Sequence, residues 1–210
     1  MTTKPAADSV EPWPRQQAHE AAMIEAAGQI WRRIDRELWV VTARHDGVSG
    51  GLLATTVGSV SIIPTEPRLV VTLAKTHHTT GLAIESGAFA VHLLRADQGA
   101  LAEWFGLSSG RDGNKFTGLK SQPGITGSPI LLDAPAAMEC RIESRTDIGD
   151  RWLLVGRVLE ARNSGESFPP LTLHQWLPQL SEETRNALKA QLITDAKSDA
   201  AALTQWRAEQ

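Results

Sequence analysis

The chain has 210 residues, of which 41% are hydrophobic and 21% are charged, a balance typical of a globular domain with additions. Its formal net charge of −3 argues against nucleic acid or an anionic membrane surface as partners. Cys140 is the single cysteine, which excludes an internal disulfide and favours a reducing, cytoplasmic location. The sequence holds no apolar run of membrane-spanning length, so we expect no membrane partner.

The first part of the chain, residues 1–15, contains prolines and small polar residues without an apolar centre. We therefore predict a mobile N-terminal arm there, and no signal peptide. From about Gln16 to Arg36, apolar residues recur at three- and four-residue spacing, which predicts a helix. This helix would open a domain over residues 16–165.

The next stretch predicts an antiparallel strand pair. Residues 38–44 are apolar and β-branched, and His45-Asp46-Gly47 supplies residues that tolerate a tight turn. The following strand is unusually thin, with small or hydroxyl-bearing residues at Gly50, Gly51, Ala54, Thr55, Thr56, Gly58, Ser59 and Ser61. Such a strand leaves space for a flat molecule whose edge bonds to amides and hydroxyls, although small residues also mark bulges and close strand crossings.

A third strand, residues 68–74, ends in a polar run that combines a cation, hydroxyls and imidazoles. The run consists of Lys75, Thr76, His77, His78 and Thr79. A positive charge, hydroxyl donors and the free amides of a starting helix suit a phosphate group. The same composition also suits a solvated loop.

Further elements follow in order. We predict a short helix from Thr79 to Ser86 that ends at Gly87, and a strand over residues 88–94 with His92 as a packed imidazole. Asp97 is a candidate N-cap for a helix through Phe105.

Residues 106–127 are rich in Gly, Ser, Asp, Asn and Lys, which predicts a long loop and a candidate lid. Arg111, Lys115 and Phe116 are placed to reach a ligand from it, or Phe116 pins the loop to the sheet.

The last strands are predicted at residues 130–132, 137–146 and 151–162. After them, residues 166–210 form a C-terminal extension. In it, Ser181 is a plausible N-cap of a long helix with acidic residues in its first turn. The helix carries one narrow apolar stripe that ends near Trp206, which predicts packing on its own domain or on a second subunit.

Several site types are excluded by spacing. His77 and His78 are adjacent and point apart, so no metal site is predicted. No G-x-S-x-G nucleophile elbow and no G-x-G-x-x-G dinucleotide fingerprint occur.

The chain resembles the flavin reductase family, whose fold is the FMN-binding split barrel, over about residues 30–162. The segments that carry the resemblance are GGLLATTVGSVSIIP, LVVTLAKTHHT, SGAFAVHLL, DQGALAEWF, GSPILLDAPAAMECRI and GDRWLLVGRVLEA. It implies a mainly β fold with flanking helices, a six-stranded antiparallel split β-barrel, and a homodimer with flavin at the subunit interface. Arg151 stands where many reductases of this kind carry His.

The resemblance also implies the site. The isoalloxazine edge would lie on Ala54, Thr55, Thr56 and Ser59, and the phosphate-binding segment would be Ala74, Lys75, Thr76, His77, His78 and Thr79. No catalytic residue is named, because hydride would pass directly from NAD(P)H to the flavin. FMN is the expected cofactor, with FAD as an alternative.

Two functions follow from these patterns. The first is an NAD(P)H-dependent flavin reductase that feeds reduced flavin or electrons to a flavin-dependent monooxygenase or another acceptor. The second is a non-catalytic flavin- or haem-binding protein on the same barrel. The sequence does not separate FMN from FAD or NADH from NADPH.

Overall fold

The computed structural model describes residues 17–107 and 113–210; the predicted arm at 1–15 and Arg111 lie outside these ranges. The chain divides into two compact units, residues 1–35 and 36–210. The first unit contains helix α1, Gln17–Arg33, which confirms the helix expected from the apolar spacing. The second unit contains every described strand and the other described helices.

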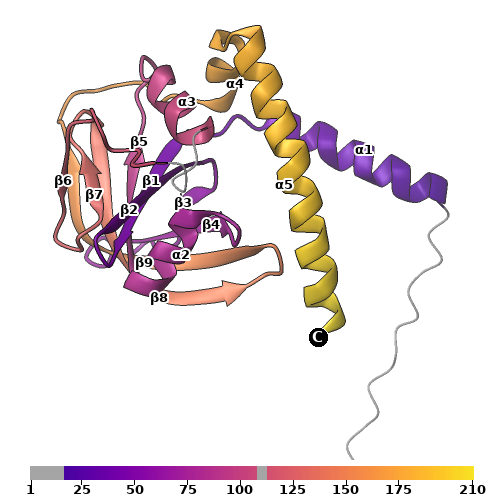
Figure 1. Cartoon of the computed structure of the whole chain (residues 1–210), viewed down its shortest axis with the longest axis horizontal. Coiled ribbons are helices and arrows are strands. Elements are labelled where there is room, and N and C mark those ends of the chain that lie inside the picture. Colours follow the sequence, from indigo (N-terminus) through magenta and orange to yellow (C-terminus); the bar gives the residue numbers. More distant parts are fainter. Residues whose placement is uncertain (1–16, 108–112) are drawn as a thin grey trace, which may run out of the picture. The chain divides into compact units, whose positions relative to one another are not determined.

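One curled antiparallel sheet forms the body of the second unit (Figure 1). Its strand order is β2-β1-β5-β8-β9-β4-β3. The strands are β1 (Trp39–His45), β2 (Val48–Ala54), β3 (Val57–Ser59), β4 (Arg68–Ala74), β5 (Ala88–Leu93), β8 (Ala136–Asp147) and β9 (Arg151–Asn163). A separate ribbon pairs β6 (Ser121–Pro123) with β7 (Pro129–Leu131).

The sheet closes on itself at a link between its two edge strands. β2 ends at Ala54 and β3 begins at Val57, so only Thr55 and Thr56 join opposite edges of the sheet. The amide of Thr72 donates to the carbonyl of Thr56 at 3.3 Å, which fixes the link against β4. This is the split barrel that was expected.

The thin second strand was predicted as one continuous element, and this was wrong. β2 pairs with β1, whereas β3 pairs with β4, so the main sheet has seven strands instead of the expected six. Ser61 lies beyond β3, where its hydroxyl accepts from the amide of Ile63 at 3.2 Å. This local side-chain bond turns the chain out of the sheet.

The described helices of this unit are α2 (His78–Ser86), α3 (Gly99–Leu107), α4 (Leu173–Trp176), the 3₁₀ turn η1 (Leu177–Gln179) and α5 (Glu182–Ala208). Gly87 ends α2 with a φ of 66°, as expected of a left-handed C-terminal residue. The hydroxyl of Ser181 accepts from the amide of Thr184 at 3.0 Å, which confirms the predicted cap. The cap predicted at Asp97 was wrong, because α3 begins at Gly99 and Gln98 is the residue before it; the Asp97 carboxylate binds the Arg95 guanidinium at 2.7 Å.

The core has two main parts. One lies between the sheet and α2 and includes Leu73, Phe89 and Leu154. The other closes one end of the barrel and includes Phe105 and Trp176.

A ring of three backbone hydrogen bonds ties the second core together. Leu38 donates to Leu171 at 2.8 Å, Leu171 donates to Leu94 at 2.7 Å, and Leu94 donates to Leu38 at 3.2 Å. All three side chains are fully buried. The start of the predicted C-terminal extension is therefore an integral wall of the barrel end.

His92 is the packed imidazole that the sequence predicted. It is fully buried; its Nδ1 donates to the carbonyl of Val40 at 3.1 Å, and its Nε2 accepts from the amide of Leu131 at 3.1 Å. These partners require the neutral ring, and burial lowers the pKa of His92 to about 4.

We expect His92 to make stability depend on pH. Its pKa is about 4 in the folded chain and 6.5 in the unfolded chain, so its stabilising contribution is complete above about pH 6.5 and is lost towards pH 4. The loss amounts to about 3 kcal/mol of unfolding free energy. Denaturant titrations between these pH values measure it. His92→Gln should flatten the pH slope, whereas His19→Gln, on an exposed face of α1, should leave it unchanged.

We expect Gly51→Ala to destabilise the fold by about 1–3 kcal/mol. A Cβ at this position would lie 2.3 Å from Cε1 of Phe105, whereas a Cβ at Gly58 would meet nothing closer than 4.0 Å. Gly58→Ala is therefore the matched control, with a change within about 0.5 kcal/mol. Equal midpoints for the two variants in urea unfolding would contradict this account of β2.

Candidate functional site

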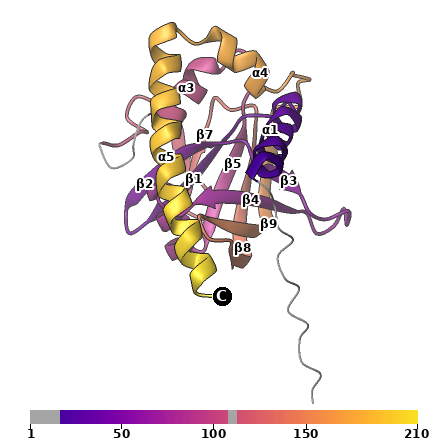
Figure 2. The ribbon, with the colours of Figure 1, turned by 90° about the vertical axis from the view of Figure 1, so that its right-hand side faces the viewer.

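A cavity of about 480 Å³ lies between the barrel wall and helix α5, within the range of about 300–1,000 Å³ that is common for small-molecule sites. Figure 2 shows α5 crossing in front of the sheet. The floor of the cavity is apolar and comes from β2 and β4, with Leu52, Leu53, Ala54, Leu73 and Ala74. An apolar floor of this kind suits a flat ring system.

Hydroxyl groups border this floor at the link between the sheet edges. Ala54, Thr55 and Thr56, which the family resemblance put at the edge of the isoalloxazine, line the cavity, and Thr72 of β4 joins them. Ser59 does not line it; its hydroxyl donates to the carbonyl of Ser61 at 3.1 Å. The structure thus brings together three of the four residues expected at the edge of a planar ligand.

Only part of the predicted phosphate-binding segment lines the cavity. Ala74 and His77 line the cavity. Thr76 and His78 lie beside His77 in the chain, outside the lining, and Thr79 is buried at 3% exposure. Lys75 also lies outside the lining, because its ammonium pairs with Asp147 and lies 5.3 Å from the centre of the Trp152 ring.

The start of α2 nevertheless offers donors to an anion. His77 is the extended residue before the helix, and the first amides of a helix have no partner within it. The Thr80 hydroxyl in this first turn is buried and has no hydrogen-bond partner among the described residues. Burial lowers the pKa of His77, which favours the neutral ring, a form that can donate one hydrogen bond.

Of the charged residues that face the cavity, Arg151 was singled out by the family resemblance, whereas the acidic residues of α5 were missed. Arg151 lines it and is held by two carboxylates, from Asp150 at 3.1 Å and from Asp199 of α5 at 2.9 Å. Asp195 lines it one helical turn away. The spacing of Asp195 and Asp199 was visible in the sequence, and residues four apart share one face of a helix. Nothing in the sequence showed which surface that face contacts.

The described part of the predicted lid is fastened to the barrel end. Lys115 is 4% exposed, and its ammonium donates to the carbonyls of Gly51 at 2.8 Å and Phe105 at 3.3 Å. Burial lowers the pKa of Lys115 to about 8. Phe116 packs against Phe105 with ring centres 5.8 Å apart. These contacts favour the interpretation in which Phe116 pins the loop.

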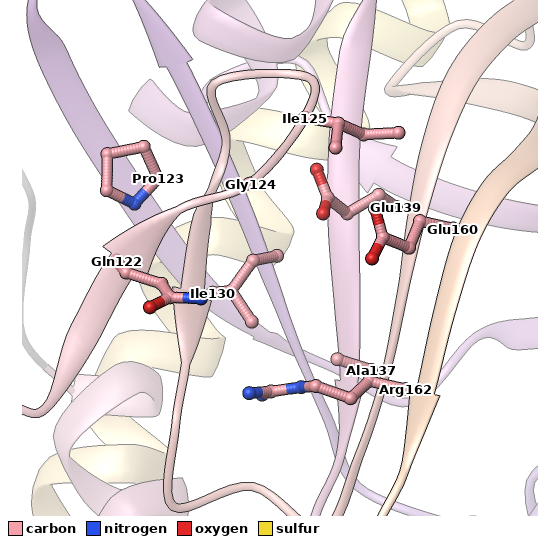
Figure 3. Close-up of a pocket in the computed structure, with 9 residues that line it drawn as sticks. All are labelled: Gln122, Pro123, Gly124, Ile125, Ile130, Ala137, Glu139, Glu160 and Arg162. Atoms are coloured by element: carbon pink, nitrogen blue, oxygen red, sulfur yellow. The ribbon is translucent and has the colours of Figure 1, made fainter.

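A second cavity, of about 270 Å³, lies between the β6–β7 ribbon and the strands β8 and β9 (Figure 3). Glu139 and Glu160 face each other across these strands, below Ile125. The Glu139 carboxylate accepts from the amide and hydroxyl of Thr126, both at 3.0 Å. Arg162 donates to the carbonyl of Leu131 at 2.8 Å. These polar groups fasten the ribbon to the sheet.

Other site types find no support in residues 17–107 and 113–210. No three His, Cys, Asp or Glu side chains gather there as metal ligands. Cys140 is buried, and burial raises the pKa of its thiol to about 12, which describes an inert thiol. Among the described helices, none combines the length and apolarity needed to cross a bilayer.

A curled antiparallel barrel with an apolar cavity at its seam and anion donors beside it defines a split-barrel protein with a small-molecule site. Residues 31–176 match the model of the flavin reductase like domain, and the chain belongs to that family. The matched range contains both sheet edges and the cavity floor.

Three relatives illustrate the similarity. The reductase subunit HsaB of a flavin-dependent monooxygenase from Rhodococcus jostii is 32% identical over 63% of this chain and 65% of its own length. The NADH-dependent FMN reductase AsuE2 from Streptomyces nodosus subsp. asukaensis is 35% identical over 58% of this chain and 67% of its own. The crystal structure of BorF, the flavin reductase component of a bacterial two-component tryptophan halogenase, is 28% identical, with a TM-score of 0.63, over 73% of this chain and 94% of BorF.

The alignments cover different shares of the relatives. The chain spans 22% of the length of a diflavin flavoprotein and 65% of HsaB. In these proteins the matching region is part of a longer chain.

Proposed function

We propose that this protein binds FMN and acts as an NAD(P)H-dependent flavin reductase that supplies reduced flavin to a partner oxygenase or another electron acceptor. The observation that carries the proposal is the link between Ala54 and Val57, where an apolar floor, three threonines and the residue that precedes α2, His77, line one cavity. The names of AsuE2, HsaB and BorF support it.

The residues present suit the flavin. Its ring would lie on the apolar floor formed by Ala54, Leu73 and Ala74, with polar ring atoms towards Thr55 and Thr56. The phosphate would lie at His77 and the first amides of α2, with Lys75, Thr76, His78 and Thr79 as the further members of that segment. Bound flavin supplies the two-electron redox chemistry.

The chain's own groups would then bind and orient the reactants. The apolar residues of the floor exclude water from one face of the cavity, and the threonines fix the in-plane orientation of a ring. Arg151 stays charged at neutral pH and is therefore suited to bind an anion, not to transfer a proton. FAD and either nicotinamide dinucleotide remain open as ligands.

The assembly is part of the same proposal. We expect a homodimer with the flavin at the subunit interface. Val60, Ile62 and Ile63 form a run of exposed apolar side chains after β3, with Ile62 fully exposed at 100%, and such runs favour contact with another chain. The FMN-binding domain over residues 16–165, the extension over 166–210 and a cytoplasmic location stay predictions.

The alternative is a non-catalytic flavin- or haem-binding protein on the same barrel. The observation that favours it is α5, which contributes a wall to the cavity and would hinder the entry of a second reactant. An absorbance spectrum of the purified protein, followed by anaerobic NADH or NADPH, separates the two. Rapid loss of flavin absorbance supports the reductase, whereas a flavin that stays oxidised with both nucleotides supports the alternative.

We expect His77→Ala to weaken FMN binding about tenfold, or about 1.4 kcal/mol, because the phosphate would lose a donor. Riboflavin, which has no phosphate, should bind as it does to the parent. Lys75→Ala should have a smaller effect on FMN, since the Lys75 ammonium is shared with Asp147.

Fluorescence titration with both flavins measures these constants. His45→Ala, on β1 and paired with Asp46 at 3.3 Å, is the control that should change neither. If His77→Ala and His45→Ala bind FMN equally, the phosphate lies elsewhere.

A further inference from the structure

Helix α5 contacts the barrel near both ends, and between them Asp199 is paired with Arg151. Near its start, the hydroxyl of Thr184 donates to the Glu103 carboxylate at 3.0 Å, and Leu188 packs on the core at the barrel end. Near its other end, Leu203 lies so close to Gly149 that a Cβ there would be 2.7 Å from Leu203 Cδ1. No residue of α5 is buried, so little apolar contact opposes its displacement.

The middle of α5 spans the cavity and carries its negative charge. Asp195 and Asp199 both line the cavity and lie four residues apart on one helix face. Across from them are His77 and Arg151, which also line it. The Asp199 side chain is 15% exposed and binds Arg151 at 2.9 Å.

These carboxylates line the same cavity as His77, beside which the proposed function puts the phosphate of the ligand. Both act on His77, since the charges of Asp195 and Asp199 raise its pKa against the larger effect of burial. Arg151 is already neutralised by Asp150 and Asp199. A phosphate beside His77 would meet two like charges and a cation that is already occupied, and desolvation strengthens both effects.

We propose that Asp195 and Asp199 of α5 compete with the phosphate of the flavin for the cationic side of the cavity. In the ligand-free chain they occupy the cationic side of the cavity, and α5 must shift or release Arg151 before a phosphorylated ligand can bind. This inference rests on the proposed function, since it concerns the same cavity. It adds that the C-terminal helix opposes FMN and does so through charge.

The thermodynamic consequence differs between ligands with and without a phosphate. A ligand that binds only when the helix is displaced has an apparent affinity reduced by the population of the displaced state. Removing the two charges should therefore strengthen FMN binding and leave riboflavin unaffected, because riboflavin carries no phosphate for the carboxylates to oppose.

The test measures the affinities for FMN and riboflavin by titration at low ionic strength. It compares the full-length protein with a full-length Asp195→Asn, Asp199→Asn double variant. We expect the ratio of FMN to riboflavin affinity to rise about tenfold, within the usual range of coupling between two sites. A Glu183→Gln, Glu209→Gln double variant makes the same change in net charge at two exposed positions, one in the first turn of α5 and one at its C-cap, and should leave the ratio unchanged.

Each other result has a defined meaning. The proposed competition is wrong if the ratio of FMN to riboflavin affinity is unchanged or lower in the aspartate variant. It is also wrong if this ratio rises equally in the control variant. Failure of the parent to bind either flavin overturns the proposed function, and this inference with it. If both flavins bind the parent while the ratio stays fixed, only the inference fails.

A spin-label distance gives a second measurement on α5 itself. Cysteines introduced at Ile193 and Val48, both exposed, can be labelled because Cys140 is buried. FMN should change the distance between the labels, whereas riboflavin should change it less. Equal distances with both flavins would contradict the proposal.

Discussion

The closure of the sheet at Thr55 and Thr56 is the constraint on which the rest of the structure depends. These two residues connect one edge strand to the other. The sheet between them therefore has to curl until its two edges lie close together. A curled sheet needs small residues where its layers approach most closely. The glycines and threonines of this region therefore serve both the closure and the cavity that forms beside it.

Arg151, which lines the cavity, is paired with carboxylates before any ligand arrives. The guanidinium of Arg151 has two carboxylate partners, one from its own hairpin and one from α5. The Arg151 side chain is 40% exposed, so the ion pairs orient this anion-binding group at the cavity wall while it stays in contact with solvent. The same pairing means that an incoming anion exchanges one partner for another. Binding is then a competition, and its outcome depends on charge more than on contact area.

Much of the barrel could be predicted from the sequence because its signals are local. The apolar runs of β1, β4 and β5, the left-handed Gly87 and the Ser181 cap each depend on neighbours within a few residues. The division between β2 and β3 could not be predicted, since it depends on which strands they pair with across the sheet. Asp97 is not the cap of α3 because the helix begins at Gly99, one residue later than the sequence pattern indicated.

The candidate site was predictable in part for the same reason. The small and hydroxyl-bearing residues were visible as a composition, and Ala54, Thr55 and Thr56 line the cavity. The role of Lys75 was not visible, because its partner Asp147 is remote in the sequence. The apolar stripe of α5 showed that the helix packs on something, but an amphipathic pattern does not identify the opposing surface.

The ring of hydrogen bonds among Leu38, Leu94 and Leu171 bears on the order in which the protein is made. During synthesis the first two of these residues leave the ribosome well before the third, so the barrel end lacks one of its walls while translation continues. Domains fold as their segments emerge, and here the last segment completes the first. A nascent chain whose Leu171 is still inside the ribosome should expose the apolar end of its barrel to chaperones, and one whose Leu171 has emerged should not.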